Sequence, residues 1–92
     1  MIIELLELGE ENARTAKELA KAQNMDIRDV MQAVRVERLA GQPICSTSKG
    51  YFIADCKQDL DATISRLYKQ ARETRRVAES MKTTRGELYD DN

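Results

Sequence analysis

The sequence contains no histidine and no tryptophan, and its 92 residues include only one proline, one phenylalanine and three tyrosines. Its two cysteines, Cys45 and Cys56, do not form a Cys-x-x-C motif, so the usual ligand sets of a zinc site are missing. We expect both to be reduced structural thiols, as is usual in the cytosol. Because aromatic side chains are scarce, the core must consist mainly of aliphatic residues.

The chain also lacks the residue combinations on which most enzymes depend. It has no Gly-rich phosphate loop, no pair of carboxylates placed for acid–base catalysis, and no serine or cysteine with a basic partner. We therefore expect a protein that is not an enzyme and that binds no cofactor and no metal.

Long apolar runs are absent as well. No stretch approaches the roughly 20 residues that a membrane-spanning helix requires. The first six residues have neither the basic start nor the long apolar segment of a signal peptide. These absences predict a cytoplasmic protein with no membrane partner.

Charge is plentiful but unevenly distributed. Charged residues make up 34% of the chain, and the formal net charge is −1. Residues 1–12 contain four acids and no base, residues 13–50 contain seven bases and four acids, and residues 62–86 contain seven bases and two acids. Two basic stretches of this kind are typical of nucleic-acid binding, although solvated faces without a partner would have the same composition.

Local signals predict two short helices in the first part of the chain. Residues 2–8 are expected to form one, which ends at Gly9. Thr15 and Glu18 have the spacing of a capping box, so a second helix is expected over residues 16–23. Between these helices, Arg14 is expected to add a short strand to a later hairpin.

A third helix is predicted over residues 27–40. Asp26 is a suitable N-cap, and Gly41 followed by Pro43 ends the helix. The apolar spacing assigns its buried side to Val30, Val34 and either Val36 or Leu39. Met25 and Met31 are interpreted as core residues.

A β-hairpin is predicted directly after this helix. Residues 43–46 and 51–54 contain β-branched and aromatic residues, and they flank a small polar turn that ends in Gly50.

The last part of the chain has the most regular pattern. A long helix is expected to start at a cap, Asp55 or Asp59, and to reach at least Met81, followed by a frayed acidic tail over 83–92. It can pack on its own chain or pair with a second copy, and we favour a homodimer. Seven residues spaced alternately by four and three form a heptad seam, which is strong at its start: Leu60, Ile64, Leu67, Ala71, Thr74, Ala78 and Met81. The predicted dimer contacts are Leu60, Ile64, Leu67 and Ala71.

This order of elements predicts the fold class: mainly α with a small β-hairpin, namely a winged helix-turn-helix followed by a long C-terminal helix. We divide the chain into a winged helix-turn-helix domain (1–55), a long dimerisation helix (56–83) and a flexible acidic tail (84–92).

In such a fold the third helix would read bases in the major groove of double-stranded DNA, and the wing, residues 46–51, would contact the backbone. Arginine can bind guanine O6 and N7, and glutamine can pair with adenine. The predicted base-reading residues are Arg28, Asp29, Gln32 and Arg35. The predicted backbone contacts are Thr15, Lys17, Lys21, Ser46, Thr47, Ser48 and Lys49.

Alternative roles are open for three charged residues of the third helix. Asp29 could accept a hydrogen bond from cytosine or could orient Arg28. Arg35 and Arg38 could instead cover apolar surface with their stems or pair with Glu37.

Residues 34–54 contain Gly-Gln-Pro-Ile-Cys-Ser followed by Ser-Lys-Gly-Tyr-Phe. This segment resembles small winged-helix proteins of phages and prophages, which have Pro-Ile-x-Ser and Ser-x-Gly-Tyr at these places, and the resemblance extends over about residues 13–82. It departs from them at Val36-Glu37-Arg38, where those proteins have a more basic helix end. The resemblance implies a DNA-binding transcriptional regulator in the cytoplasm of a bacterial host.

The leading hypothesis is therefore a phage-type, DNA-binding transcriptional regulator. The net charge of −1 and the acidic first segment leave a second hypothesis open, a winged-helix protein–protein adaptor. A third is an accessory factor for phage replication or excision without a regulatory role.

Overall fold

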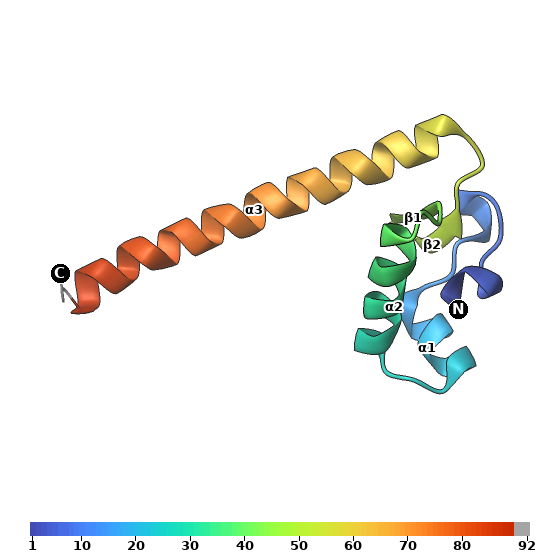
Figure 1. The fold of residues 1–92 in the computed structure, drawn as a ribbon, viewed down its shortest axis with the longest axis horizontal. Helices are drawn as coiled ribbons and strands as arrows, with labels where there is room; N and C mark the ends of the chain where they lie inside the picture. The colour runs from blue at the N-terminus through green and yellow to red at the C-terminus, as the bar shows by residue number, and fades with distance from the viewer. Residues whose placement is uncertain (90–92) are drawn as a thin grey trace.

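A computed structural model describes residues 1–89 as a mainly helical chain with one two-stranded antiparallel sheet (Figure 1). Residues 1–54 form a compact part, which we call the head, and one long helix projects from it. No helix within residues 1–89 is long and apolar enough to cross a membrane. The elements, in chain order, are the 3-10 helices η1 (Ile2–Leu5) and η2 (Glu10–Asn12), the helices α1 (Ala16–Gln23) and α2 (Ile27–Leu39), the strands β1 (Ile44–Thr47) and β2 (Gly50–Ile53), and helix α3 (Lys57–Tyr89).

Helix α1 has the predicted bounds and the predicted cap. Thr15 Oγ1 accepts the N–H of Glu18 at 3.1 Å, and the Thr15 N–H donates to Glu18 Oε1 at 2.8 Å. The bond from the Thr15 backbone lowers the pKa of the Glu18 carboxyl, because it stabilises the charged form. The helix ends at Asn24, which adopts the left-handed conformation with φ 52°.

Helix α2 follows after a turn of three residues, 24–26. Asp26 occupies the N-cap position, but its side chain forms no cap hydrogen bond. Val30 and Val34 are buried as predicted. The prediction for the next buried residue was wrong, since Val36 is 52% exposed and Leu39 is 77% exposed.

The third buried residue of α2 is an acid, Glu37. It follows Val30 and Val34 at spacings of four and three, so it lies on the same face of the helix. Its carboxylate accepts the N–H groups of Ile2 at 2.7 Å and of Ile3 at 2.8 Å. The first amides of η1, which have no partner within a helix, are therefore satisfied by a side chain of α2.

The hairpin pairs Ile44 with Ile53 and Cys45 with Phe52. Arg14 of the N-terminal segment forms an isolated antiparallel bridge with Tyr51, which is less than the short strand expected at Arg14. The bridge comes so close to Gly50 that a Cβ there would collide with the Arg14 carbonyl. Glycine is required at this position for that reason and for its φ of 126°.

The core lies between the N-terminal segment, α1, α2 and the hairpin. Met31 is not part of it, contrary to our interpretation, since its side chain is 55% exposed, and Met25 is only partly covered. The buried apolar residues are Ile2, Leu6, Leu19, Ala20, Val30, Val34, Ile44, Cys45 and Phe52.

Helix α3 starts at Lys57, between the two predicted caps, and Asp59 Oδ2 accepts the N–H of Asp55 at 2.9 Å. It runs as one helix of 33 residues to Tyr89, so the end predicted at residue 83 was too early. Thr83 and Thr84 continue the helix, with their hydroxyls donating to carbonyls one turn back. Residues 90–92 of the predicted tail lie outside the described residues.

We predict that Glu37→Ala destabilises the head by about 2–4 kcal/mol, because it leaves two backbone N–H groups near the core without an acceptor. Glu37→Gln keeps one acceptor oxygen and should therefore lose less stability than Glu37→Ala. Urea unfolding followed by circular dichroism measures the change. Glu87→Ala, at an exposed site on α3, is the control and should change stability by less than about 0.5 kcal/mol. Equal stability of the Glu37 and Glu87 variants would contradict the role of this carboxylate.

Candidate nucleic-acid interface

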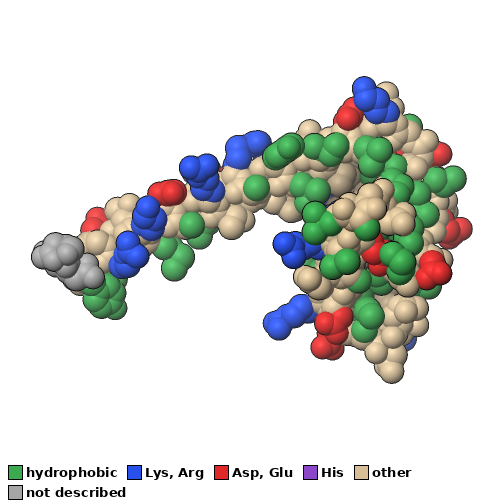
Figure 2. All heavy atoms as spheres, in the orientation of Figure 1, with side chains coloured by type: hydrophobic (Ala, Val, Ile, Leu, Met, Phe, Trp, Pro, Cys, Tyr) green, Lys and Arg blue, Asp and Glu red, His purple; other side chains and the backbone are tan. Residues whose placement is uncertain are grey.

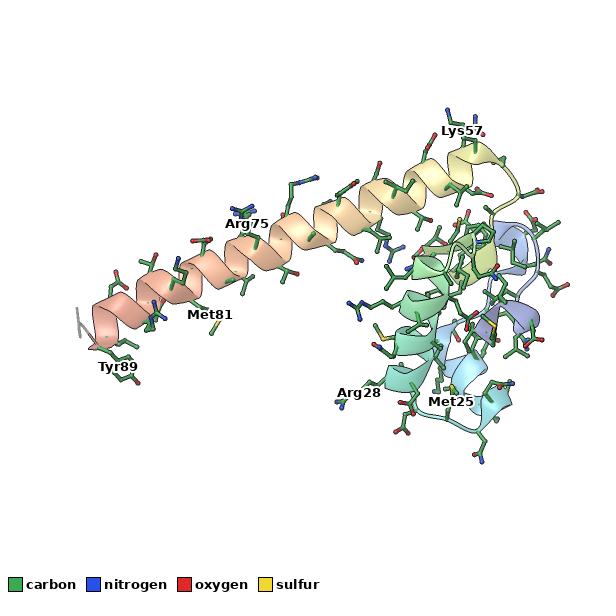
Figure 3. All side chains as sticks on the ribbon, in the orientation of Figure 1. Met25, Arg28, Lys57, Arg75, Met81 and Tyr89 are labelled. Atoms are coloured by element: carbon green, nitrogen blue, oxygen red, sulfur yellow. The ribbon has the colours of Figure 1, made fainter. Side chains whose placement is uncertain are left out.

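One face of α2 points away from the core and carries three of the predicted base-reading residues. Arg28, Gln32 and Arg35 are exposed, and their spacings of four and three residues align them opposite Val30 and Val34. Figure 3 shows Arg28 extending from α2 into open space. These three side chains can thus reach a ligand together.

Asp29 is also exposed but lies on a neighbouring flank of α2, seven residues before Val36. The ion pairs found within residues 1–89 do not include Asp29 with Arg28. The alternative in which Asp29 orients Arg28 therefore receives no support from the arrangement of these side chains.

The predicted backbone contacts at α1 differ in which hydrogen-bonding groups remain free to contact a ligand. Lys17 and Lys21 are exposed. Thr15 Oγ1 already accepts the Glu18 N–H, so this hydroxyl can offer its proton to an outside acceptor while its role in the cap continues.

On the hairpin, Ser48 and Lys49 form an exposed tip, while Thr47 Oγ1 accepts the Lys49 N–H at 3.1 Å. Ser46, which was predicted to contact a ligand with these residues, is half-buried and accepts a hydrogen bond from Arg38. The part of the hairpin that is free to meet a ligand is consequently short.

Arg38 holds the hairpin against α2. Its Nε donates to the Ile44 carbonyl at 2.8 Å, its Nη2 donates to Ser46 Oγ at 3.1 Å, and its guanidinium lies 5.9 Å from the centre of the Tyr51 ring. Burial lowers the pKa of Arg38, yet a guanidinium stays charged at neutral pH. Arg38 therefore positions the hairpin, and it does not pair with Glu37.

Ser46 also joins the head to α3. Its N–H donates to Thr63 Oγ1 at 3.3 Å, and Thr63 is the buried residue of α3. Next to this contact lies the thiol of Cys45, whose pKa is raised by burial. Three elements, α2, β1 and α3, thus meet at Ser46.

Sequence reasoning did not identify the roles of Glu37, Arg38 and Thr63. Glu37 had a signal that could have been used, because it continues the spacing of Val30 and Val34. Thr63 had none, since it lies beside the apolar seam of α3 and resembles any exposed threonine.

The seam of α3 is only half covered by the head. Leu60, Ile64 and Leu67 are between 37% and 49% exposed, although a groove between α3 and the head, lined also by Gln42 and Ile44, includes all three. Figure 2 shows the open space between the head and the projecting part of α3. The head therefore leaves much of this apolar surface free.

Within residues 1–89, no group of three or more His, Cys, Asp or Glu side chains is arranged to hold a metal ion. No known family, curated protein or solved structure matches this chain. The surface of α2 and the seam of α3 must therefore be interpreted from their own chemistry.

The two thiols give a direct test of this arrangement. Cys56 is exposed and Cys45 is buried with a raised pKa, so we predict that only Cys56 reacts rapidly with a disulfide reagent such as DTNB. Cys45 should react after denaturation. Cys56→Ser should remove the rapid phase, and a rapid phase of two thiols in the folded protein would contradict the packing of β1 on α3.

Proposed function

We propose that this chain is a winged helix-turn-helix protein that binds double-stranded DNA and acts as a phage-type transcriptional regulator. In this proposal α1 and α2 form the helix-turn-helix, α2 enters the major groove, and the hairpin is the wing. The observation that carries the proposal is the outward face of α2, on which Arg28, Gln32 and Arg35 are exposed together.

The chemistry of this face suits base edges. Arg28 and Arg35 can each bind O6 and N7 of guanine, Gln32 can bind N6 and N7 of adenine, and Asp29 on the flank can accept from N4 of cytosine. The exposed ammonium groups of Lys17, Lys21 and Lys49 can contact phosphates. With few such contacts and a net charge of −1, binding should be modest and should weaken as salt rises.

We further propose that the DNA-binding form is a homodimer joined through α3. The half-exposed seam residues Leu60, Ile64 and Leu67, with Ala71 next to them, support this part of the proposal. A dimer presents two copies of the α2 face, as proteins that bind paired half-sites do.

A protein–protein adaptor is the second candidate, and one observation favours it. Met31 and Leu39 are large apolar residues of α2 that are mostly exposed, and both line a groove between α2 and α3. An apolar surface of this kind is typical of protein contacts. The two candidates differ in whether Arg28 and Gln32 matter for DNA binding.

The experiment is a selection of random double-stranded DNA on the purified full chain at about 50 mM salt, followed by binding titrations with the selected sequence. We predict that Arg28→Ala and Gln32→Ala each weaken binding by about 1–3 kcal/mol, since each removes a base contact. A rise in salt should weaken binding. The logarithm of the association constant should fall with the logarithm of the salt concentration, with a slope of about −0.9 per phosphate contact.

Lys57→Ala is the matched control, because it also removes one exposed positive charge but at the start of α3, far from Arg28 (Figure 3). Its affinity for the selected sequence should equal that of the unmodified chain. If no sequence is enriched, or if the Arg28 and Lys57 variants bind alike, the DNA-binding proposal is wrong and the adaptor is favoured.

A further inference from the structure

The second half of α3 has no support from the rest of the described chain. Every residue from Ala71 to Tyr89 is exposed to solvent, over roughly 28 Å of helix at 1.5 Å per residue. In proteins most of the stability of a helix comes from packing its apolar face. A partner along its seam would therefore stabilise the projecting half.

The seam runs through this unsupported half with the same spacing. After Ala71 it continues through three smaller or flexible residues and then ends in one base and one large apolar residue. The continuing seam residues are Thr74, Ala78, Met81, Arg85 and Leu88. Large apolar side chains thus lie near both ends, with Ala71, Thr74 and Ala78 between them.

We propose that α3 pairs antiparallel with α3 of a second copy, so that the projecting half of each helix covers the half of the other that carries the head. This inference rests on the proposed homodimer and adds its geometry. The partner is a second copy because the chain itself carries both complementary halves of the surface.

In an antiparallel coiled coil each seam residue of one helix packs against a seam residue of the other, and the alternating spacing of four and three determines which residues pair. Ile64 packs against Met81 of the second copy, Leu67 against Ala78, and Ala71 against Thr74. The two-fold axis then passes through the segment of small residues, where the backbones can approach closely. Each half-exposed residue near the head gains a neighbour, and Met81, which is 66% exposed, is covered as well.

Arg85 distinguishes the two orientations. In a parallel pair the two Arg85 residues, one from each copy, would face each other within the seam, and like charges there are destabilising. In the antiparallel pair Arg85 lies at Leu60 of the other copy, where its stem can cover the leucine and its guanidinium can reach the exposed carboxylate of Asp61. Charge therefore favours the antiparallel orientation.

An apolar residue outside the seam points to the same orientation. Val77 is 60% exposed and lies two heptads after Thr63, so it shares the flank of α3 that contacts β1. In an antiparallel pair these flanks of both helices lie on one side, which brings Val77 of one copy toward the head of the other.

The same symmetry determines where the heads lie. A two-fold axis perpendicular to the helix pair leaves both Thr63 flanks, and hence both heads, on one face of the dimer. The two α2 faces can then meet a single DNA duplex. In a parallel pair the two heads would lie on opposite sides of the pair, at the same height.

Disulfide cross-linking of the full chain tests the orientation, in a Cys56→Ser background. One variant carries Ile64→Cys and the other, made with a tag that changes its mass, carries Met81→Cys. We expect a cross-linked heterodimer when the two are mixed and oxidised, and little cross-linking when either is oxidised alone. Cross-linking of the Met81→Cys variant with itself shows a parallel pair and overturns the proposal, as does a dimer in which the mixture does not cross-link.

Light scattering separates this result from the failure of dimerisation or of DNA binding. The unmodified chain should have twice the mass of a monomer, and Ala71→Glu should halve that mass by placing a charge in the seam. Ser65→Glu adds the same charge to an exposed position outside the seam and should leave the dimer intact. A monomeric unmodified chain overturns the antiparallel pairing, whether or not the chain binds DNA. A cross-linked antiparallel dimer that enriches no DNA sequence supports the pairing and shows that the proposed DNA-binding function is wrong.

Discussion

The buried carboxylate of Glu37 accepts the first two amide N–H groups of η1 and so fixes the N-terminal segment on α2, over sequence separations of 35 and 34 residues. A head this small has little apolar surface to bury, and polar contacts must therefore define where its segments lie. The next residue, Arg38, does the same for the hairpin, through Ile44 and Ser46. Two adjacent residues near the end of α2 thus hold the segments on either side of it.

This use of Glu37 and Arg38 determines which face of α2 is free. Because Val30, Val34 and Glu37 face the core, the residues at the opposite positions, Arg28 and Gln32 among them, must face solvent. The exposure of the outward face of α2 therefore follows from the positions of Val30, Val34 and Glu37, which form the buried stripe of this helix. A change in the buried stripe would therefore alter the candidate surface without any substitution at Arg28 or Gln32.

The elements that depend on local signals were predictable from the sequence. The capping box of Thr15 and Glu18 gave the start of α1, the break in the pattern at Asn24 gave its end, and Gly41 with Pro43 gave the end of α2 to within one residue. The outward position of Arg28 followed from the helix period alone. The side chains of three proposed backbone contacts, Thr15, Ser46 and Thr47, turned out to have hydrogen-bond partners within the chain.

What could not be predicted depends on contacts between distant segments. The partner of Glu37 is a backbone that carries no side-chain signal, and the partner of Thr63 is the N–H of Ser46. The end of α3 was placed too early because Thr83, Thr84 and Gly86 are weak helix formers, yet two threonine hydroxyls bond back to the helix and the helix continues. Propensity describes each residue alone, whereas these outcomes depend on the neighbours that the fold supplies.

The junction at Ser46 connects the two surfaces that the chain offers. Its hydroxyl accepts from Arg38 of α2 and its N–H donates to Thr63 of α3, so this residue of β1, together with the apolar residues of α3 that border the head, sets the direction of the α2 face relative to α3. In an antiparallel dimer the distance between the two α2 faces is then set by the length of α3 between the two Thr63 residues and by this junction. A hydrogen bond of 3.3 Å at a single site holds less firmly than an apolar interface would. The hydrogen bond at Ser46 is therefore a weaker constraint on this direction than the apolar packing that holds α2 within the head.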